Sequence, residues 1–346
     1  MTIQDTFLEK ISLPDSLYRI AIRKQLKQRL KSEHNHYKSK TIEDYVNFLN
    51  AQPIAAKAEE ANDQHYEVPV TFFENVMGKY KKYSCCLFET GNETLDEAEE
   101  AMLHLTCERA KLLDGQHILE LGCGWGSLTL YMAKKFPKSK ITAVSNSHSQ
   151  REFIEQKLLE KKLQNVTVLT QNVATLTLSE RVDRIISIEM MEHIRNYEKM
   201  FHNIARWLKK NGKVFIHIFG HKTMPYIFDD TQEKSWMAKH FFTGGQMPSK
   251  QLFSYVKSDF HIEKTWEVSG LHYAKTCDKW LQNMDGSKSK IMPIFRKTYG
   301  KEAKKFWIYW RLFFMACEEL FAFNNGNEWQ VYHYLFSKKN DGSIQK

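Results

Sequence analysis

The sequence contains no run of about 18 consecutive apolar residues, the length that a membrane-spanning helix needs. Its most apolar late stretch, residues 307–323, is interrupted by Arg311, Glu318 and Glu319, so a buried amphipathic helix is expected there. The first ten residues carry acidic side chains and lack the apolar segment of a secretory signal. A cytoplasmic protein without stable membrane insertion is therefore expected.

Cysteine is scarce and shows no informative spacing. The six cysteines include no C-x-x-C pair and no zinc-ligand pattern, so no metal site is predicted. A chain of 346 residues can bury a large core and needs no disulfide framework. Free cysteines in a reducing, intracellular compartment are expected; they are Cys85, Cys86, Cys107, Cys123, Cys277 and Cys317.

Long blocks of one charge are also absent, although the formal net charge is +9. The basic residues are spread along the chain, which favours a solvated basic surface over a surface that binds nucleic acid. One basic segment is predicted to be a helix that opens at Pro14 and Asp15, with an apolar stripe from Leu17 to Leu30. Such a helix is compatible with a membrane surface, but packing on its own domain is the preferred interpretation.

Strand and helix patterns alternate from residue 116 onward, after a helical region at residues 1–62. The alternation predicts a parallel sheet that is covered by helices on both faces, with ligands at the carboxyl ends of the strands. The expected strands are residues 117–122, 140–146, 165–173, 183–190 and 213–220. Between residues 221 and 325 aromatic side chains become dense, which fits an aromatic core or a cap with a substrate pocket.

The stretch Ile118–Gly126 runs from the first expected strand into a turn with glycines at every second position. A nicotinamide dinucleotide site has a different glycine spacing and an acid at the end of the second strand, and the chain has no carboxylate there before Glu152. No Gly-Lys-Ser/Thr follows, so a P-loop is excluded. The charge of Glu120 would repel phosphate but suits an ammonium or sulfonium group. These features favour S-adenosylmethionine as the ligand.

Three polar side chains, Glu189, Glu192 and His193, follow the fourth expected strand. If a helix begins there, the three residues share one face. An alkylamine is mostly protonated at neutral pH, so a base that accepts its proton raises the rate of methyl transfer by about 10²–10⁴-fold. A histidine beside a carboxylate can be that base, although a solvated surface pair is the alternative.

Several motifs, taken together, resemble one family. Glu120–Gly126 is similar to the cofactor loop of class I S-adenosylmethionine-dependent methyltransferases. From about Tyr66 to the C-terminus the chain resembles the coclaurine N-methyltransferases, in a wider group that includes the cyclopropane fatty acid synthases. The motifs that carry this resemblance are YSCC (83–86), ITAVSNSHSQ (141–150), IEMMEH (188–193), HKTMPYIF (221–228), FFTGGQMPS (241–249), HYAKT (272–276) and NNGNEW (324–329).

The resemblance implies an α/β, Rossmann-like methyltransferase domain over residues 63–346, with a mostly parallel seven-stranded sheet and a cap at roughly 221–325. It implies N-methylation of a small, aromatic or cyclic amine, with His193 as base, Glu192 as its partner and Glu189 binding the cofactor or the amine. A homodimer is compatible with it. The implied substrate-binding residues are His217, Phe219, Tyr226, Phe242, Tyr273 and Trp329.

The cofactor site is expected from the glycine turn and from the resemblance together. One residue departs from the family pattern: Asn172 stands where an acid is usual, and its carbonyl can still accept a hydrogen bond from the adenine amino group, so cofactor binding should weaken rather than vanish. The expected cofactor-binding residues are Tyr83, Ser84, Glu120, Gly122, Gly124, Asn146, Gln150, Asn172, Val173 and Glu189.

Two alternatives to an amine methyltransferase remain. The first is modification of unsaturated phospholipid chains in the manner of the cyclopropane fatty acid synthases, whose bicarbonate site is matched by Cys85, Glu192, His217 and Tyr273. Phe219 stands where those enzymes tend to have an aliphatic residue. The second is a non-catalytic protein that binds the cofactor, for which Asn172 is the only support.

Overall fold

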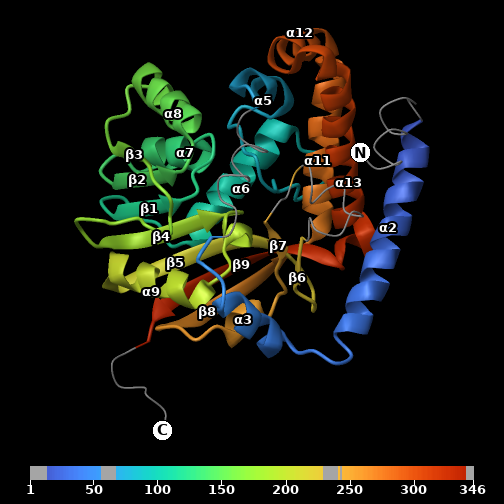
Figure 1. Ribbon diagram of the computed structural model, residues 1–346. Coiled ribbons are helices and arrows are strands. Elements are labelled where there is room, and N and C mark those ends of the chain that lie inside the picture. Colours follow the sequence, from blue (N-terminus) through green and yellow to red (C-terminus); the bar gives the residue numbers. More distant parts are fainter. Residues whose placement is uncertain (1–13, 56–67, 229–240, 242–243, 340–346) are drawn as a thin grey trace.

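The computed structural model describes residues 14–55, 68–228, 241 and 244–339. Its centre is a seven-stranded sheet in the order β3-β2-β1-β4-β5-β9-β8 (Figure 1). The first five of these strands pair in parallel, and β9 is antiparallel to both of its neighbours. The predicted mostly parallel seven-stranded α/β fold is confirmed. The strands are β1 (His117–Leu121), β2 (Lys140–Ser145), β3 (Val166–Thr170), β4 (Val182–Ile188), β5 (Leu208–His221), β8 (Phe260–Val268) and β9 (Trp329–Lys338).

Five of the seven strands lie where the sequence pattern placed them, but β8 and β9 do not appear among the expected segments. The first eight residues of β9 are all buried, so the strand shows no polar alternation that would identify it. β8 lies inside the range predicted as cap, 221–325, and pairs with β9 as the edge strand of the main sheet. The predicted domain boundary after residue 62 lies outside the described residues.

Helices cover both faces of the sheet (Figure 1). Neighbouring residues of β4 point to opposite faces of the sheet. Ile186 packs against the helices of one face, α6 (Leu95–Arg109) and α7 (Ser127–Lys135). Ile185 packs on the other face, against α9 (Tyr197–Trp207). α8 (His148–Glu160) packs over β2 and β3. The sheet is thus buried on both sides, and the carboxyl ends of β1 to β5 share one edge.

Beside the sheet, four helices pack around a core of aromatic rings. They are α5 (Val70–Val76), α11 (Gly270–Gly286), α12 (Lys288–Tyr299) and α13 (Ala303–Gly326). The Phe72 and Trp310 ring centroids are 4.8 Å apart, and Phe241 stacks on Phe313 at 4.5 Å. Most of the C-terminal aromatic residues are therefore core, which was one of the two interpretations of the sequence.

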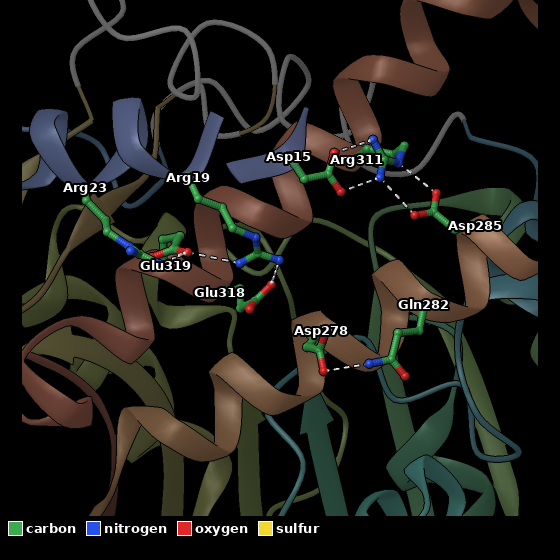
Figure 2. A network of polar contacts seen from close by, with 9 residues as sticks. All are labelled: Asp15, Arg19, Arg23, Asp278, Gln282, Asp285, Arg311, Glu318 and Glu319. Carbon is green, nitrogen blue, oxygen red and sulfur yellow. Dashed lines mark hydrogen bonds and ion pairs between the residues drawn. The ribbon is translucent and has the colours of Figure 1, made fainter. Parts of the chain in front are cut away.

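The basic N-terminal helix, α2 (Asp15–His36), packs along α13. Glu319, with 7% of its side chain exposed, accepts from both Arg19 (3.0 Å) and Arg23 (2.5 Å). Arg311 of α13 bridges Asp15 and Asp285, with 2.7 Å to an oxygen of each (Figure 2). This agrees with the preferred interpretation of a helix that packs on its own protein.

The remaining elements are short. α3 (Ile42–Asn50) begins with a capping box, because the Thr41 hydroxyl accepts from the Asp44 N–H and the Asp44 carboxylate accepts from the Thr41 N–H. Within the described ranges, no helix has the length and apolarity that crossing a membrane requires. The other elements are β6 (Tyr226–Ile227), β7 (Gln246–Met247), η1 (Met191–His193), η2 (Leu252–Tyr255) and η3 (Gly300–Glu302).

Candidate active site

The glycine turn connects β1 to α7 at the carboxyl edge of the sheet. Gly122, Gly124 and Gly126 all have positive φ angles, of 78°, 52° and 77°. A Cβ on Gly126 would lie 2.6 Å from the Ile154 side chain, so that glycine allows the turn to pack on α8. A Cβ on Gly124 would meet nothing within 4 Å, so this glycine borders open space that a ligand can approach closely.

That open space is a cavity of about 150 Å³ between the strand ends. It brings together all ten residues that the sequence analysis assigned to cofactor binding, and His193 lies in its wall as well. The lining residues come from the ends of four strands and from the YSCC segment that precedes α6. Residues far apart in the sequence therefore meet at the position that the parallel sheet predicts for a ligand.

The cavity wall carries buried polar atoms that suit a polar ligand. The Gln150 side chain, 2% exposed, accepts at Oε1 from the Ser145 hydroxyl at 2.6 Å. Its Nε2 has no hydrogen-bond partner in the part of the chain that the structure describes, and the same holds for the Ser127 hydroxyl and the Trp125 indole N–H. Buried polar groups normally find partners, and the amide and indole N–H groups can donate to the carboxylate, hydroxyl or ring-nitrogen acceptors of S-adenosylmethionine.

Charge at the cavity comes from Glu120 and Lys82. Burial raises the pKa of Glu120 to about 8, and the Thr129 hydroxyl donates to it at 2.5 Å. Lys82, which the sequence analysis did not single out, is 3% exposed and donates to the hydroxyl of Ser84. Its position directly before the YSCC motif is the one sequence signal that points to it. The cavity thus offers a carboxyl group for a cation and an ammonium group for a carboxylate.

Asn172 lies at the mouth of the cavity and is exposed. Its side-chain carbonyl accepts from the Ala174 N–H at 2.9 Å, which closes a local turn. One of the two lone pairs is therefore already used, and one remains for a ligand.

Glu189 is the centre of a buried hydrogen-bond cluster beside the cavity. Its Oε1 accepts from the Cys85 N–H at 2.9 Å and lies 3.1 Å from His217 Nε2, while the Tyr273 hydroxyl donates to Oε2 at 2.5 Å. The pKa of Glu189 is raised by burial, an effect that Lys82, the Cys85 N–H and the Tyr273 hydroxyl offset only in part. Three donors converge on one carboxylate that has 8% of its side chain exposed.

Glu192 and His193 lie in a single 3-10 turn, η1, rather than at the start of an α-helix. Glu192 is fully buried and accepts at Oε1 from the Phe219 N–H at 2.9 Å, and burial together with Glu189 raises its pKa. Its Oε2 has no hydrogen-bond partner among the described residues. Glu192 and His193 are adjacent in this turn, and the partnership expected between them stays a prediction. Burial and Arg195 lower the pKa of His193 to about 4, so its imidazole is neutral.

The expected substrate-binding residues fall into two groups. Near Glu189, Tyr273 stacks on Phe321 at 4.3 Å, and Phe321 contacts Phe219 edge-on at 6.1 Å. His217 belongs to the same group through its contact with Glu189. Tyr226 and Trp329 form a separate pair, joined by a 3.0 Å hydrogen bond from the indole N–H to the phenol oxygen. Phe242 lies outside the described residues.

No metal site accompanies these groups: the described residues contain no cluster of three or more His, Cys, Asp or Glu side chains that could hold an ion. All six cysteines are free. Methyl transfer from a sulfonium donor needs a bound donor, a positioned acceptor and a proton acceptor, and the cavity with its adjoining carboxylates and neutral histidine can provide these.

Comparisons with known proteins agree with this geometry. Residues 54–331 match the family model described as mycolic acid cyclopropane synthetase. The chain is 40% identical over 343 residues to (S)-coclaurine N-methyltransferase of Thalictrum flavum subsp. glaucum, covering 96% of this chain and 95% of that protein. The (S)-coclaurine N-methyltransferase of Papaver somniferum is 37% identical over 335 residues, covering 94% and 95%.

A solved structure supports the same relationship at the level of the whole fold. The crystal structure of coclaurine N-methyltransferase bound to N-methylheliamine and SAH superposes with a TM-score of 0.92 and 36% identity, covering 97% of this chain and 99% of that one.

Proposed function

The chain belongs to the mycolic acid cyclopropane synthetase family and is similar over nearly its full length to the coclaurine N-methyltransferases. We propose that its acceptor is a small aromatic or cyclic amine of the coclaurine or tetrahydroisoquinoline type. The chain is an S-adenosylmethionine-dependent N-methyltransferase. When bound, the cofactor supplies a methyl group on a positively charged sulfur.

The observation that carries the proposal is the position of the Glu189 carboxylate. It is held by the Cys85 N–H, His217 and Tyr273 at the edge of the cofactor cavity. A carboxylate fixed beside the methyl donor attracts the cationic form of an amine and keeps its nitrogen close to the reacting carbon. The ring stack that includes Tyr273 and Phe321 suits the aromatic part of such a substrate.

The same carboxylate argues against a lipid-modifying activity. Three of the residues that match the bicarbonate site of the cyclopropane fatty acid synthases, Cys85, His217 and Tyr273, bind Glu189 in this chain. A side chain that belongs to the protein thus takes up the donors that a bicarbonate ion would need. We infer that turnover requires no bicarbonate.

We assign His193 the role of proton acceptor. Its imidazole is neutral and lines the cavity, so it can accept the proton that a primary or secondary amine loses when the new nitrogen–carbon bond forms. Glu192 is the proposed partner of His193: it directly precedes His193 in η1 and is fixed by the Phe219 N–H. Glu189 binds the amine, and Lys82 with Ser84 binds the carboxylate of the donor.

A screen of amines tests the proposal. The purified chain is incubated with S-adenosylmethionine and a panel of primary, secondary and tertiary amines, and products are detected by the mass gain of one methyl group. Methylation of cyclic aromatic amines without added bicarbonate is expected. Methyl transfer to unsaturated phospholipid vesicles that depends on bicarbonate, with no amine methylated, would contradict the proposal.

The wider setting is also a proposal. We place the enzyme in the cytoplasm, because all six cysteines are free. A second copy of the chain is the proposed protein partner, and light scattering on the eluted peak of a sizing column tests it: a mass of one chain would contradict a homodimer.

A further inference from the structure

Behind Glu189, three adjacent strands place two histidines next to each other. Ile188 at the end of β4 pairs with His217 of β5, and His217 pairs in turn with His333 of β9. Both imidazoles are 0% exposed; their ring centroids are 4.5 Å apart and the planes are inclined by 34°. His333 has no part in the roles assigned above, although a fully buried histidine needs hydrogen-bond partners.

The outer end of this pair is fixed by Arg109, the last residue of α6. Its Nη1 lies 2.8 Å from His333 Nδ1. A guanidinium can only donate, so Nδ1 accepts and the single proton of the neutral His333 ring lies on Nε2. Arg109 is half-buried and lies over the Trp266 ring of β8, 5.0 Å from its centroid, which holds the guanidinium in place.

The inner end is fixed by Glu189. A carboxylate can only accept, so His217 donates from Nε2 to Glu189 Oε1, and the Nδ1 of the neutral His217 ring must be an acceptor. Within the described residues, neither His217 Nδ1 nor His333 Nε2 has a hydrogen-bond partner. The two atoms left over are therefore one acceptor and one donor, on rings that are in contact. If Glu189 were a protonated donor, the two atoms would both be donors.

We propose that Arg109, His333 and His217 are positioning residues that hold the Glu189 carboxylate ionised and aimed at the amine, through a hydrogen-bonded relay that one buried water completes between the two rings. The water accepts from His333 Nε2–H and donates to His217 Nδ1. The relay runs from the surface at α6 to the active site. This inference rests on the amine-binding role proposed for Glu189.

The positive charges around the relay act in the same direction. The positive groups that face it are Arg109 from α6 and Lys82 from the segment before α6, and both keep the pKa of His217 and His333 low, in addition to burial. In a chain of hydrogen bonds each bond polarises the next, so neutral rings can strengthen the hydrogen bond to Glu189 without becoming charged. On the far side of Glu189, the Tyr273 hydroxyl of α11 donates to it, whereas Glu192 is a second buried carboxyl that opposes its charge.

Paired substitutions separate the relay from packing. His333→Phe keeps a ring but removes both nitrogens, whereas His333→Gln can accept from Arg109 and donate inward. At the outer end, Arg109→Met removes the donor and Arg109→Lys keeps one. Phe215→Leu is the packing control, because the Phe215 ring contacts the His333 ring edge-on at 5.1 Å and carries no polar atom.

We expect His333→Phe and Arg109→Met to lower kcat by about 10- to 100-fold, since a misplaced catalytic group loses rate on that scale. The acidic limb of the kcat profile should move to higher pH, because a carboxylate with weaker donors is easier to protonate. The dissociation constant for S-adenosylmethionine should not change. His333→Gln, Arg109→Lys and Phe215→Leu should keep the wild-type pH profile. Wild-type kcat and an unmoved acidic limb in both His333→Phe and Arg109→Met would overturn the proposal.

A second measurement needs no acceptor and so stands even if the proposed amine is wrong. Long-range ¹H–¹⁵N spectra of the histidine-labelled enzyme, assigned with His217→Gln and His333→Gln, report which ring nitrogen carries the proton. Both rings should be neutral and protonated at Nε2 at pH 7. A proton on Nδ1 of either ring, or a charged ring, would overturn the relay independently of turnover.

Discussion

At the scale of single residues, the candidate site contains carboxyl groups and histidines whose pKa values are shifted by burial. His193 is neutral because burial lowers its pKa to about 4, and Glu120 has a pKa of about 8. The Glu189 carboxylate accepts hydrogen bonds from three donors. We propose that these groups have separate roles in holding the donor, holding the amine and accepting the proton.

Replacing the proposed base should separate turnover from cofactor binding. His193→Ala is expected to lower kcat by about 10²–10⁴-fold, because His193 is the one histidine among the described residues that line the cavity. The dissociation constant for S-adenosylmethionine should stay nearly unchanged. Rates with a methylated amine and calorimetric binding measure the two quantities. Near-normal turnover of the variant at several pH values would rule out the role of His193.

Binding of the cofactor should release a proton from Glu120. The free enzyme holds this carboxyl mostly protonated at pH 7, because burial raises its pKa to about 8. A cationic group nearby lowers the pKa, so the proton leaves on binding. Calorimetry at pH 7 in buffers of different ionisation enthalpy should show more protons released by the wild type than by Glu120→Gln. Equal proton release would place the donor's charges away from Glu120.

The sequence indicated candidate site residues but not all of their contacts. The glycine turn and the family resemblance together indicated ten residues, and these line one cavity. The partnership of Glu192 with His193 stays a prediction, whereas the contact of Glu192 with the Phe219 N–H of β5 was not expected from the sequence. That contact joins residues 27 positions apart, and no local pattern carries it.

At the scale of elements, the N-terminal helix and the C-terminal helices are joined by charge. Glu319 of α13 forms ion pairs with Arg19 and Arg23 of α2, and Arg311 of α13 forms ion pairs with Asp15 and Asp285 (Figure 2). Exposed ion pairs contribute little to the free energy of unfolding. Glu319, however, has only 7% of its side chain exposed, and it pairs with two arginines at once. The apolar stripe of α2 predicted a packed helix, whereas its acidic partners nearly 300 positions away could not be identified from the sequence.

Loss of the shared carboxylate should loosen α2 without unfolding the protein. Glu319→Gln is expected to destabilise the contact by about 1 kcal/mol and to speed amide hydrogen exchange in residues 15–36. Lys24→Gln on the exposed side of the same helix is the matched control and should leave exchange unchanged. Hydrogen exchange with mass spectrometry measures both variants. Equal exchange in Glu319→Gln and the wild type would show that apolar packing alone holds α2.

At the scale of the whole molecule, the strand ends of the parallel part of the sheet line the cavity, and β9 pairs with β5 on the side away from β4. The sequence pattern located β1 to β5, since alternating strands and helices with short turns are visible locally. The sequence pattern did not predict β9, because the strand is buried on both faces and its residues do not alternate between apolar and polar. β9 is also the strand that contains His333. The least regular part of the sequence thus contributes the relay behind Glu189.

The central claim is that a carboxylate of the chain itself, rather than bicarbonate, supports methyl transfer to an amine. The most direct measurement is the initial rate of methyl transfer to a tetrahydroisoquinoline amine in bicarbonate-depleted buffer, with and without added bicarbonate. We predict the same rate in both conditions for the wild type and a rate lower by about 10²-fold or more for Glu189→Gln. A rate that requires bicarbonate, or a Glu189→Gln variant as fast as the wild type, would contradict the account.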